Sequence, residues 1–282
     1  MAAACGAADA PQADARDAVR DATTTTPPER PTTTAAPAPT TTTTTTIDPY
    51  APPAWLGQRP LPVTADGFGE VQATPPELDP RRIQQPDVLP PPAGAAFEST
   101  VQAVPDDVAA RSTWSPACPI TLDQLRYVTV TFWGFDGDHH RGELLVHADA
   151  AAPLVEVFRA LDAARYPIEE MRVVAAPELD LAPTGDGNNT TAFVCRPVRG
   201  ATSWSQHAYG LAVDVNPFLN PYVKGGLVLP ELASAYTDRT RTDPGVLHAD
   251  DPAVRAFAAI GWGWGGDWSS LKDYQHFSAN GR

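Results

Sequence analysis

The sequence predicts a mixed α+β domain that follows a long disordered tail. The first hundred residues hold 18 of the 31 prolines, and 14 of the 24 positions from Thr23 to Thr46 are threonine. Such a stretch has too little apolar surface to offset the entropy lost on ordering, so we expect it to stay extended. From about Phe97 onward, apolar runs with strand and helix periods follow one another without a regular β-α-β alternation.

These observations divide the chain into residues 1–96, tail and linker, and residues 97–282, one globular domain. Residues 48–96 are still rich in proline but also contain Trp55, Leu56 and Phe68. We therefore expect a linker that lies in part against the domain. The remaining stretch of roughly 185 residues is long enough to bury a core of its own.

The first elements of the domain are expected to form a β-hairpin. Residues 127–133 are rich in β-branched and aromatic side chains and alternate in polarity, which predicts a strand. Residues 134–141 contain Gly, Asp and a histidine pair and predict a loop. Residues 143–147 then predict the partner strand.

Two helices and a short strand are expected after the hairpin. Pro153 is predicted to open the first helix, because apolar residues follow it at helical spacing. Residues 171–175 predict a short strand. The second helix is expected to begin at Pro252 with Asp251 as its N-cap, and to end in the glycine-rich segment 261–266.

The charge of the chain narrows the classes of partner. A formal net charge of −14 argues against nucleic acid and against anionic membrane surfaces. The sequence contains no run of roughly 18 apolar residues, so it predicts no transmembrane helix.

The three cysteines indicate an extracytoplasmic protein. Cys118 and Cys195 lie in the globular part, and a disulfide between them would fit an exported protein, whereas the alternative is two buried thiols. Cys5, between Ala4 and Gly6, resembles the end of a bacterial lipoprotein signal, although the charged and apolar regions of such a signal are missing. We hypothesise that the natural start lies upstream and that Cys5 carries a lipid; the alternative is an ordinary tail cysteine.

The segment from Ser203 to Asp214 and the later Asp273-Tyr-Gln-His276 together hold two imidazoles and two carboxylates. This inventory suits a zinc site with an open coordination position. His207 and Asp214 are seven positions apart. At this spacing, neither a regular strand nor a helix would bring the two side chains to one ion. Gly210 between them allows a bend after which a strand continues, and His276 would be the third ligand. The other histidines (His139, His140, His147 and His248) stay unassigned, and the first two are expected to be solvated in the hairpin loop.

These segments resemble one family of enzymes. The run Asn188–Arg196, the motif Ser205-x-His207-x6-Asp214, the Trp262-x-Trp264-Gly-Gly266 segment and Asp273-x-x-His276-Phe277 together are similar to the D-alanyl-D-alanine metallopeptidases. The wider superfamily includes vancomycin-resistance D,D-peptidases, L-alanyl-D-glutamate endopeptidases and the hedgehog signalling domain. The resemblance covers about residues 115–279 and implies a small antiparallel sheet flanked by helices.

The resemblance also implies roles for individual residues. His207, Asp214 and His276 would bind zinc, Asp273 would be the general base, and Arg196 would stabilise the transition state. Ser205 matches a position that contacts substrate in relatives. Where some relatives carry Glu as the base this chain carries Asp273, whose reach is shorter by one methylene, about 1.5 Å.

The implied activity is hydrolysis of peptidoglycan stem peptides, as a D-alanyl-D-alanine carboxypeptidase or as an L-alanyl-D-glutamate-type endopeptidase. A catalytically silent, zinc-stabilised wall-binding domain is the competing interpretation, and a peptidase of other peptides is a third. We expect a monomer that is secreted or lipid-anchored at the bacterial cell envelope.

Overall fold

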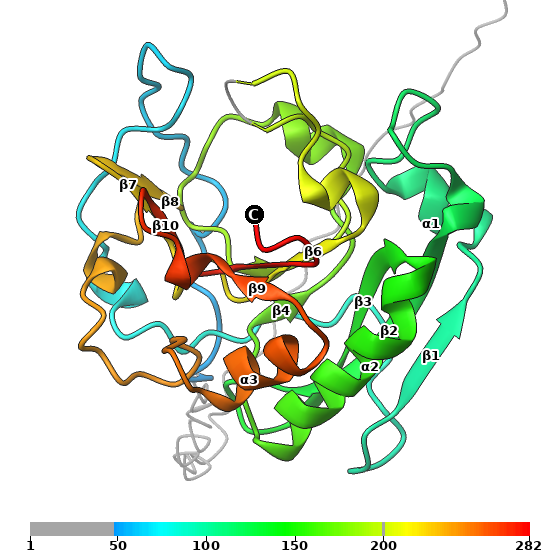
Figure 1. Ribbon diagram of the computed structural model, residues 1–282. Helices are drawn as coiled ribbons and strands as arrows, with labels where there is room; N and C mark the ends of the chain where they lie inside the picture. Colours follow the sequence, from blue (N-terminus) through cyan, green and yellow to red (C-terminus); the bar gives the residue numbers. More distant parts are fainter. Residues whose placement is uncertain (1–47, 199–200) are drawn as a thin grey trace, which may run out of the picture. The chain divides into compact units, whose positions relative to one another are not determined.

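The computed structural model describes residues 48–198 and 201–282, and it confirms the α+β class. The expected tail and Cys5 lie outside the described residues. In these described residues, small antiparallel sheets are combined with three α-helices (Figure 1). Within the described residues, no helix has the length and apolar character that crossing a membrane would need.

The largest sheet has the order β1-β2-β3 and is antiparallel throughout. Its strands are Ser99–Gln102, Leu125–Trp133 and His139–His147. The predicted hairpin is therefore present, but it has a third strand that the sequence did not reveal. Its loop is also shorter than expected, since Gly134 N–H already donates to Asp138 O at 2.8 Å.

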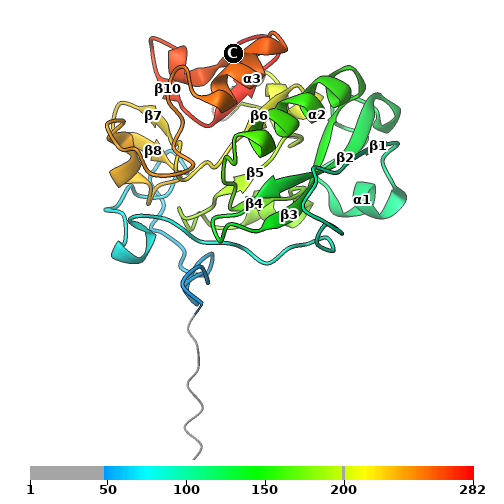
Figure 2. The ribbon, with the colours of Figure 1, turned by 90° about the horizontal axis from the view of Figure 1, so that it is seen from below.

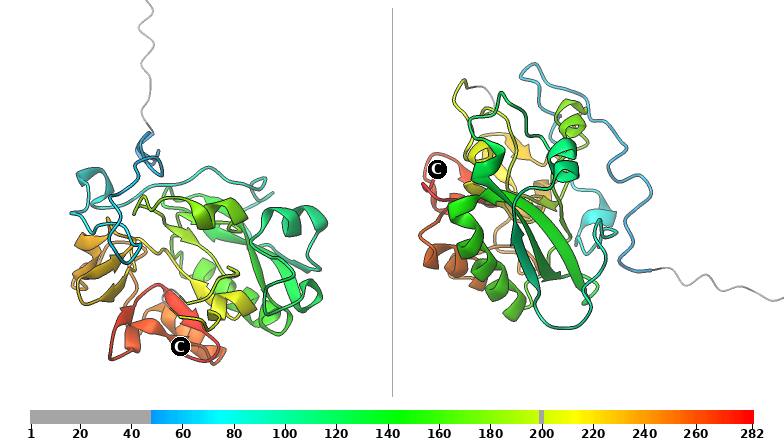
Figure 3. Two further views of the ribbon diagram at one scale, coloured as in Figure 1. Left: turned by 90° about the horizontal axis from the view of Figure 1, so that it is seen from above. Right: turned by 90° about the vertical axis from the view of Figure 1, so that its right-hand side faces the viewer.

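Helices cover both faces of this sheet. Helix α2 (Ala148–Ala163) packs on the side chains of Val128, Val130 and Phe132. Helix α1 (Asp106–Arg111) lies on the other side of the sheet from α2 (Figures 2 and 3). Its Val108 packs in a cluster with Leu125 and Tyr127, whose side chains leave β2 on the opposite face from Val128 and Val130. A buried leucine of α2 such as Leu154 contributes about 1.5–3 kcal/mol to stability.

The expectation that Pro153 opens α2 is wrong. The helix begins five residues earlier, where the Nδ1 atom of the N-cap His147 accepts a hydrogen bond from Asp149 N–H. Pro153 thus lies inside the helix, at a cost of about 3 kcal/mol. Ala150 and Ala151 are buried against the sheet, so tertiary packing outweighs that local cost.

The other sheets are short and built around the C-terminal half. One has the order β6-β11-β9, with strands Ala212–Asp214, His276–Ser278 and Gly263–Trp264. A second has the order β10-β7-β8, with strands Lys272–Asp273, Tyr222–Lys224 and Leu227–Leu229. A parallel pair joins β4 (Glu170–Met171) to β5 (Asn189–Thr190). The strand expected over residues 171–175 is therefore limited to its first position.

Helix α3 (Pro252–Ala259) begins and ends where the sequence indicates. Asp251 is at the N-cap position, but its carboxylate accepts the N–H of His248 at 2.7 Å instead of a helix N–H. Gly261 follows the helix with φ +81°, a left-handed conformation that favours glycine.

The segment 48–96 packs on the domain far more closely than a linker would. Leu61, Leu78 and Ile83 are buried in a cluster with Phe218 and Tyr236. This segment and the later residues belong to a single compact unit. The proline-rich composition hid this packing because its apolar residues are widely spaced along the chain.

Candidate metal centre

His207 is held by a short 3₁₀ turn over Gln206–Tyr209. Ser205 is the N-cap, and its Oγ accepts the His207 N–H at 3.3 Å. Gly210 ends the turn with φ +65°, and a Cβ there would come within 2.5 Å of His147 N. The predicted glycine bend is therefore confirmed, and no other residue fits the position without strain.

The other two residues of the group come from neighbouring strands. Strands β6 and β11 are antiparallel, and Asp214 lies directly opposite His276 in their register. Residues that face each other in this way project from the same side of the sheet. The bend at Gly210 then brings His207 to that same side.

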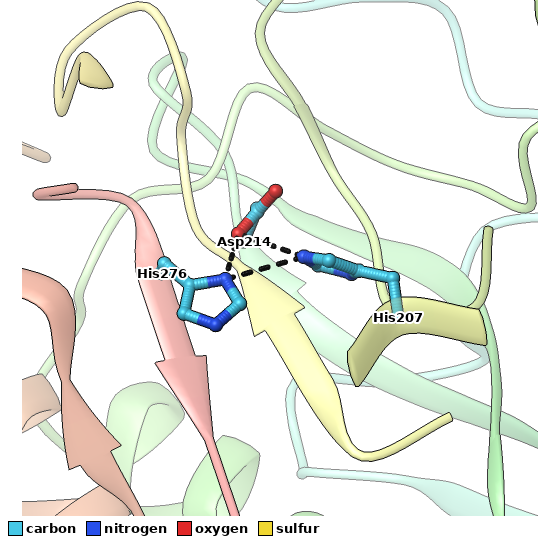
Figure 4. Close-up of side chains that lie close together, drawn as sticks. All are labelled: His207, Asp214 and His276. Carbon is cyan, nitrogen blue, oxygen red and sulfur yellow. Dashed lines mark hydrogen bonds and ion pairs between the residues drawn. The ribbon is translucent and has the colours of Figure 1, made fainter. Parts of the chain in front are cut away.

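Three ligand atoms meet at the centre of this arrangement (Figure 4). His207 Nε2 lies 3.2 Å from both His276 Nδ1 and Asp214 Oδ1, and the last two atoms are 3.0 Å apart. A tetrahedral ion with bonds of about 2.0–2.1 Å has edges of roughly 3.3 Å. The group therefore matches one face of such a coordination shell and could hold a metal ion.

The far side of each imidazole ring is fixed by a backbone carbonyl. His207 Nδ1 donates to Ala192 O at 2.6 Å, and His276 Nε2 donates to Arg282 O at 3.3 Å. Ser278 Oγ donates to the same Arg282 carbonyl at 2.9 Å. Because these main-chain oxygens can only accept, each ring keeps a proton on its outer nitrogen, and a ring that loses the proton of its inner nitrogen points a lone pair to the centre.

Asp214 is kept ionised by its neighbours. Burial alone would raise its pKa, but the positive charge of His207 and hydrogen bonds from both histidines hold the pKa well below its usual range. An ionised carboxylate and two neutral imidazoles are the donor set that zinc accepts in catalytic sites.

Asp273 lies beside this group but differs from Asp214 in its hydrogen bonds and in its pKa. Its Oδ1 atom is buried and has no hydrogen-bond partner among the described residues. Burial, and then the negative charge of Asp214, raise the pKa of Asp273 to about 7. A carboxyl with this pKa can both accept and release a proton near neutral pH.

The glycine-rich segment after α3 holds the Asp273 turn in place. A Cβ on Gly265 would collide with the backbone carbonyl of Asp273, so only glycine permits this approach. Trp264 Nε1 donates to Tyr274 O at 2.8 Å, and Lys272 Nζ donates to Gly266 O at 2.9 Å. The nearby Asp267 is exposed on the turn Gly265–Asp267.

A family model described as D-alanyl-D-alanine carboxypeptidase matches residues 199–279. The resemblance to the D-alanyl-D-alanine metallopeptidases is confirmed. The matched stretch contains His207, Asp214, Asp273 and His276, and it supports a peptidase of this family. No curated protein and no solved structure matches the chain.

Arg196 precedes the stretch that matches the peptidase family. The segment before it runs beside the site, since Thr191 and Asp214 exchange backbone hydrogen bonds and Val194 N–H donates to His207 O at 3.2 Å. Arg196 is close enough for its charge to lower the pKa of Asp273. The predicted Cys118–Cys195 disulfide is confirmed and anchors this segment next to Arg196.

Ser205 is buried, and its visible contact is the cap on the His207 turn. The histidines left unassigned lie outside the metal group. His139 pairs with Asp162 at 2.8 Å, and His140 lies between Asp87 and Asp136. The expectation that these two are solvated in a loop is wrong, because β3 begins at His139 and carboxylates surround both rings.

The sequence interpretation missed two residues that accompany Asp273 beside the candidate metal centre. Tyr222 lies directly opposite Asp273 in the register of β7 and β10, and Lys224 follows on the same face. One signal was available: Lys224 and Lys272 are the only two lysines in 282 residues, and both belong to this strand pair.

Proposed function

We propose that this protein is a zinc metallopeptidase that hydrolyses peptidoglycan stem peptides, acting as a D-alanyl-D-alanine carboxypeptidase. The observation that carries the proposal is the pairing of a three-atom metal group with a carboxylate that has one buried oxygen without a hydrogen bond. His207, Asp214 and His276 offer one face of a tetrahedron, and Asp273 stands beside them without a hydrogen bond to Oδ1.

A zinc ion held by His207, Asp214 and His276 would supply a Lewis acid and lower the pKa of a water molecule toward neutrality. Asp273 then has the role of the general base. Its free Oδ1 accepts the proton that the attacking water loses, and it returns that proton to the amine of the leaving residue.

Arg196 stabilises the negative oxygen that develops on the peptide carbonyl in this mechanism. Its guanidinium is always charged, and its segment is fixed by the neighbouring disulfide. A fixed cation at this position lowers the energy of the transition state more than that of the substrate. Ser205 is proposed to contact the substrate while its hydroxyl caps the His207 turn.

We propose that the enzyme is exported and works at the bacterial cell envelope as a monomer. The disulfide fits an oxidising compartment. A lipid on Cys5 would tether the domain through the Thr/Pro-rich tail, which in extended form adds about 3 Å per residue. Labelling with a radioactive fatty acid would test the anchor, and loss of label in Cys5→Ser would support it.

The substrate is tested by incubating the zinc-loaded protein with purified muropeptides and analysing the products by mass spectrometry. The proposal predicts removal of a single C-terminal alanine from pentapeptide stems. Release of the stem after its first residue would indicate the endopeptidase instead. A zinc-containing protein that changes no muropeptide would favour the silent wall-binding domain.

A further inference from the structure

The two faces of the small sheet β10-β7-β8 differ in burial, since Val228 is buried on one face and Lys224 is exposed on the other. Val223, Val228 and Lys272 share a face in the strand register, and Val228 is buried in the cluster around Phe218. The opposite face carries Asp273 and four residues from β7 and β8, none of which is fully buried: Tyr222, Lys224, Leu227 and Leu229. The proton-transferring carboxylate thus belongs to a partly open surface with its own side chains.

Tyr222 is the nearest of these residues to Asp273. Residues directly opposite in an antiparallel pair have Cβ atoms about 4.5–5.5 Å apart. Burial and then the charge of Asp273 raise the pKa of Tyr222, which agrees with this closeness. Its hydroxyl has no hydrogen-bond partner among the residues that the structure describes.

Lys224 supplies the charge on this face. It is exposed, and within residues 48–198 and 201–282 its ammonium forms neither an ion pair nor a hydrogen bond. Its Cβ is the diagonal neighbour of Asp273, at about 7–8 Å, and a lysine stem of about 6 Å can span much of that gap. Its charge is therefore available to an anionic group.

We propose that Tyr222 and Lys224 form the subsite for the leaving residue, and that Lys224 binds its free α-carboxylate. The inference rests on the proposed function, because Asp273 must deliver its proton to the leaving amine. That amine therefore lies next to Asp273, and the α-carboxylate of the same residue is roughly 3 Å further on. This places the carboxylate between Asp273 and Lys224, with the ring of Tyr222 as the side wall.

This subsite would make the enzyme prefer a peptide bond next to a free C-terminus. A carboxylate near Lys224 gains an ion pair together with a hydrogen bond, whereas a neutral C-terminal amide can accept a hydrogen bond but gains no ion pair. The negative charge of Asp214 and the acidic surroundings would otherwise repel a carboxylate from this region. Lys224 is thus a specificity-determining residue and takes no part in the proton transfer.

The test compares two substrates that end in D-Ala-D-Ala and differ only in a free C-terminal carboxylate or a C-terminal amide. We expect zinc-loaded wild-type protein to prefer the acid by about tenfold in kcat/KM. Lys224→Met should reduce the acid-to-amide ratio to about one, chiefly through KM, and Lys224→Glu should reverse the preference.

Arg159→Met is the matched control, since Arg159 is an exposed cation on α2 whose contacts are an ion pair with Glu156 at 3.2 Å and the Phe97 ring at 4.6 Å. This variant should keep the wild-type ratio, and all variants should keep the melting temperature of the wild type. A ratio that Lys224→Met leaves at the wild-type value, or a wild type that does not discriminate, would overturn the subsite while the peptidase stands. A zinc-loaded wild type that cuts neither substrate would overturn the proposed function itself.

Discussion

Two acidic residues of this protein, Glu169 and Asp273, are held in opposite ways. Both oxygens of Glu169 accept hydrogen bonds of 2.6 Å from Arg81, and Asn188 Nδ2 adds a third at 2.7 Å. Asp273 leaves Oδ1 buried without any partner in the described part of the chain. Since native proteins satisfy nearly all buried polar atoms, this exception supports our proposal that Asp273 exchanges a proton.

Arg81 is the reason that both carboxylate oxygens of Glu169 have hydrogen-bond partners. Arg81 belongs to the segment before the domain and also donates to Asp186 O at 2.9 Å and stacks on the Phe218 ring at 4.3 Å. Both Arg81 and Glu169 are about 1% exposed. This ion pair joins residues 48–96 to the domain and so stabilises the fold, whereas the role that we propose for Asp273 is in the reaction.

Replacing Asp273 should have the largest effect on turnover. Asp273→Ala removes the group that transfers the proton, and we expect kcat to fall by about 10²–10⁴-fold. The three ligand atoms are untouched, so the zinc content should stay at the wild-type level. Muropeptide hydrolysis and metal analysis on the same sample check both parts, and activity within a few-fold of wild type would show that another group is the base.

Replacing Glu169 should have the largest effect on folding. Glu169→Gln leaves the Arg81 guanidinium buried without its counter-charge, which costs about 3–5 kcal/mol of unfolding free energy. Urea denaturation measures this loss, and the folded fraction should keep its activity per molecule. Glu156→Gln is the control, because its exposed pair with Arg159 contributes only about 0–1 kcal/mol. Equal losses of unfolding free energy in Glu169→Gln and Glu156→Gln would contradict a structural role for the buried pair.

The pKa of Asp273 predicts a smaller, pH-dependent effect in the metal-free protein. A folded-state pKa of about 7 exceeds the value near 4 in the unfolded chain, so the folded chain binds this proton more tightly. Stability of the wild type is therefore lost as pH rises from about 4 to about 7, and Asp273→Asn avoids this loss. With a chelator present, the Asn variant should melt at least several degrees higher at pH 8 and no higher at pH 4, since each unit of pKa shift contributes about 1.4 kcal/mol. A difference that does not change with pH would contradict the raised pKa.

The sequence predicted those features that depend on residues close together in the chain. The bend at Gly210, the second helix after Asp251 and the glycine end of that helix all follow from local backbone preferences. The choice of His207, Asp214 and His276 came from spacing and family resemblance, and the register of β6 and β11 brings them together.

Features that depend on distant partners were not predictable in this way. Arg81 and Glu169 are 88 residues apart, so nothing near Arg81 indicates that it is buried. Strands β7 and β10 have three and two residues, too few for an alternation pattern, and the pairing of Tyr222 with Asp273 stayed hidden. The prediction that α2 begins at Pro153 was wrong because packing of the residues before it outweighs the local cost of proline in a helix.

The most direct test of the metal centre is the zinc stoichiometry of the purified protein before and after His207→Ala. We expect one zinc per chain in the wild type and in Asp273→Ala, and well below one in His207→Ala, because only two ligands remain. Circular dichroism should show that the variant is still folded. A folded His207→Ala protein that retains a full equivalent of zinc would contradict the account.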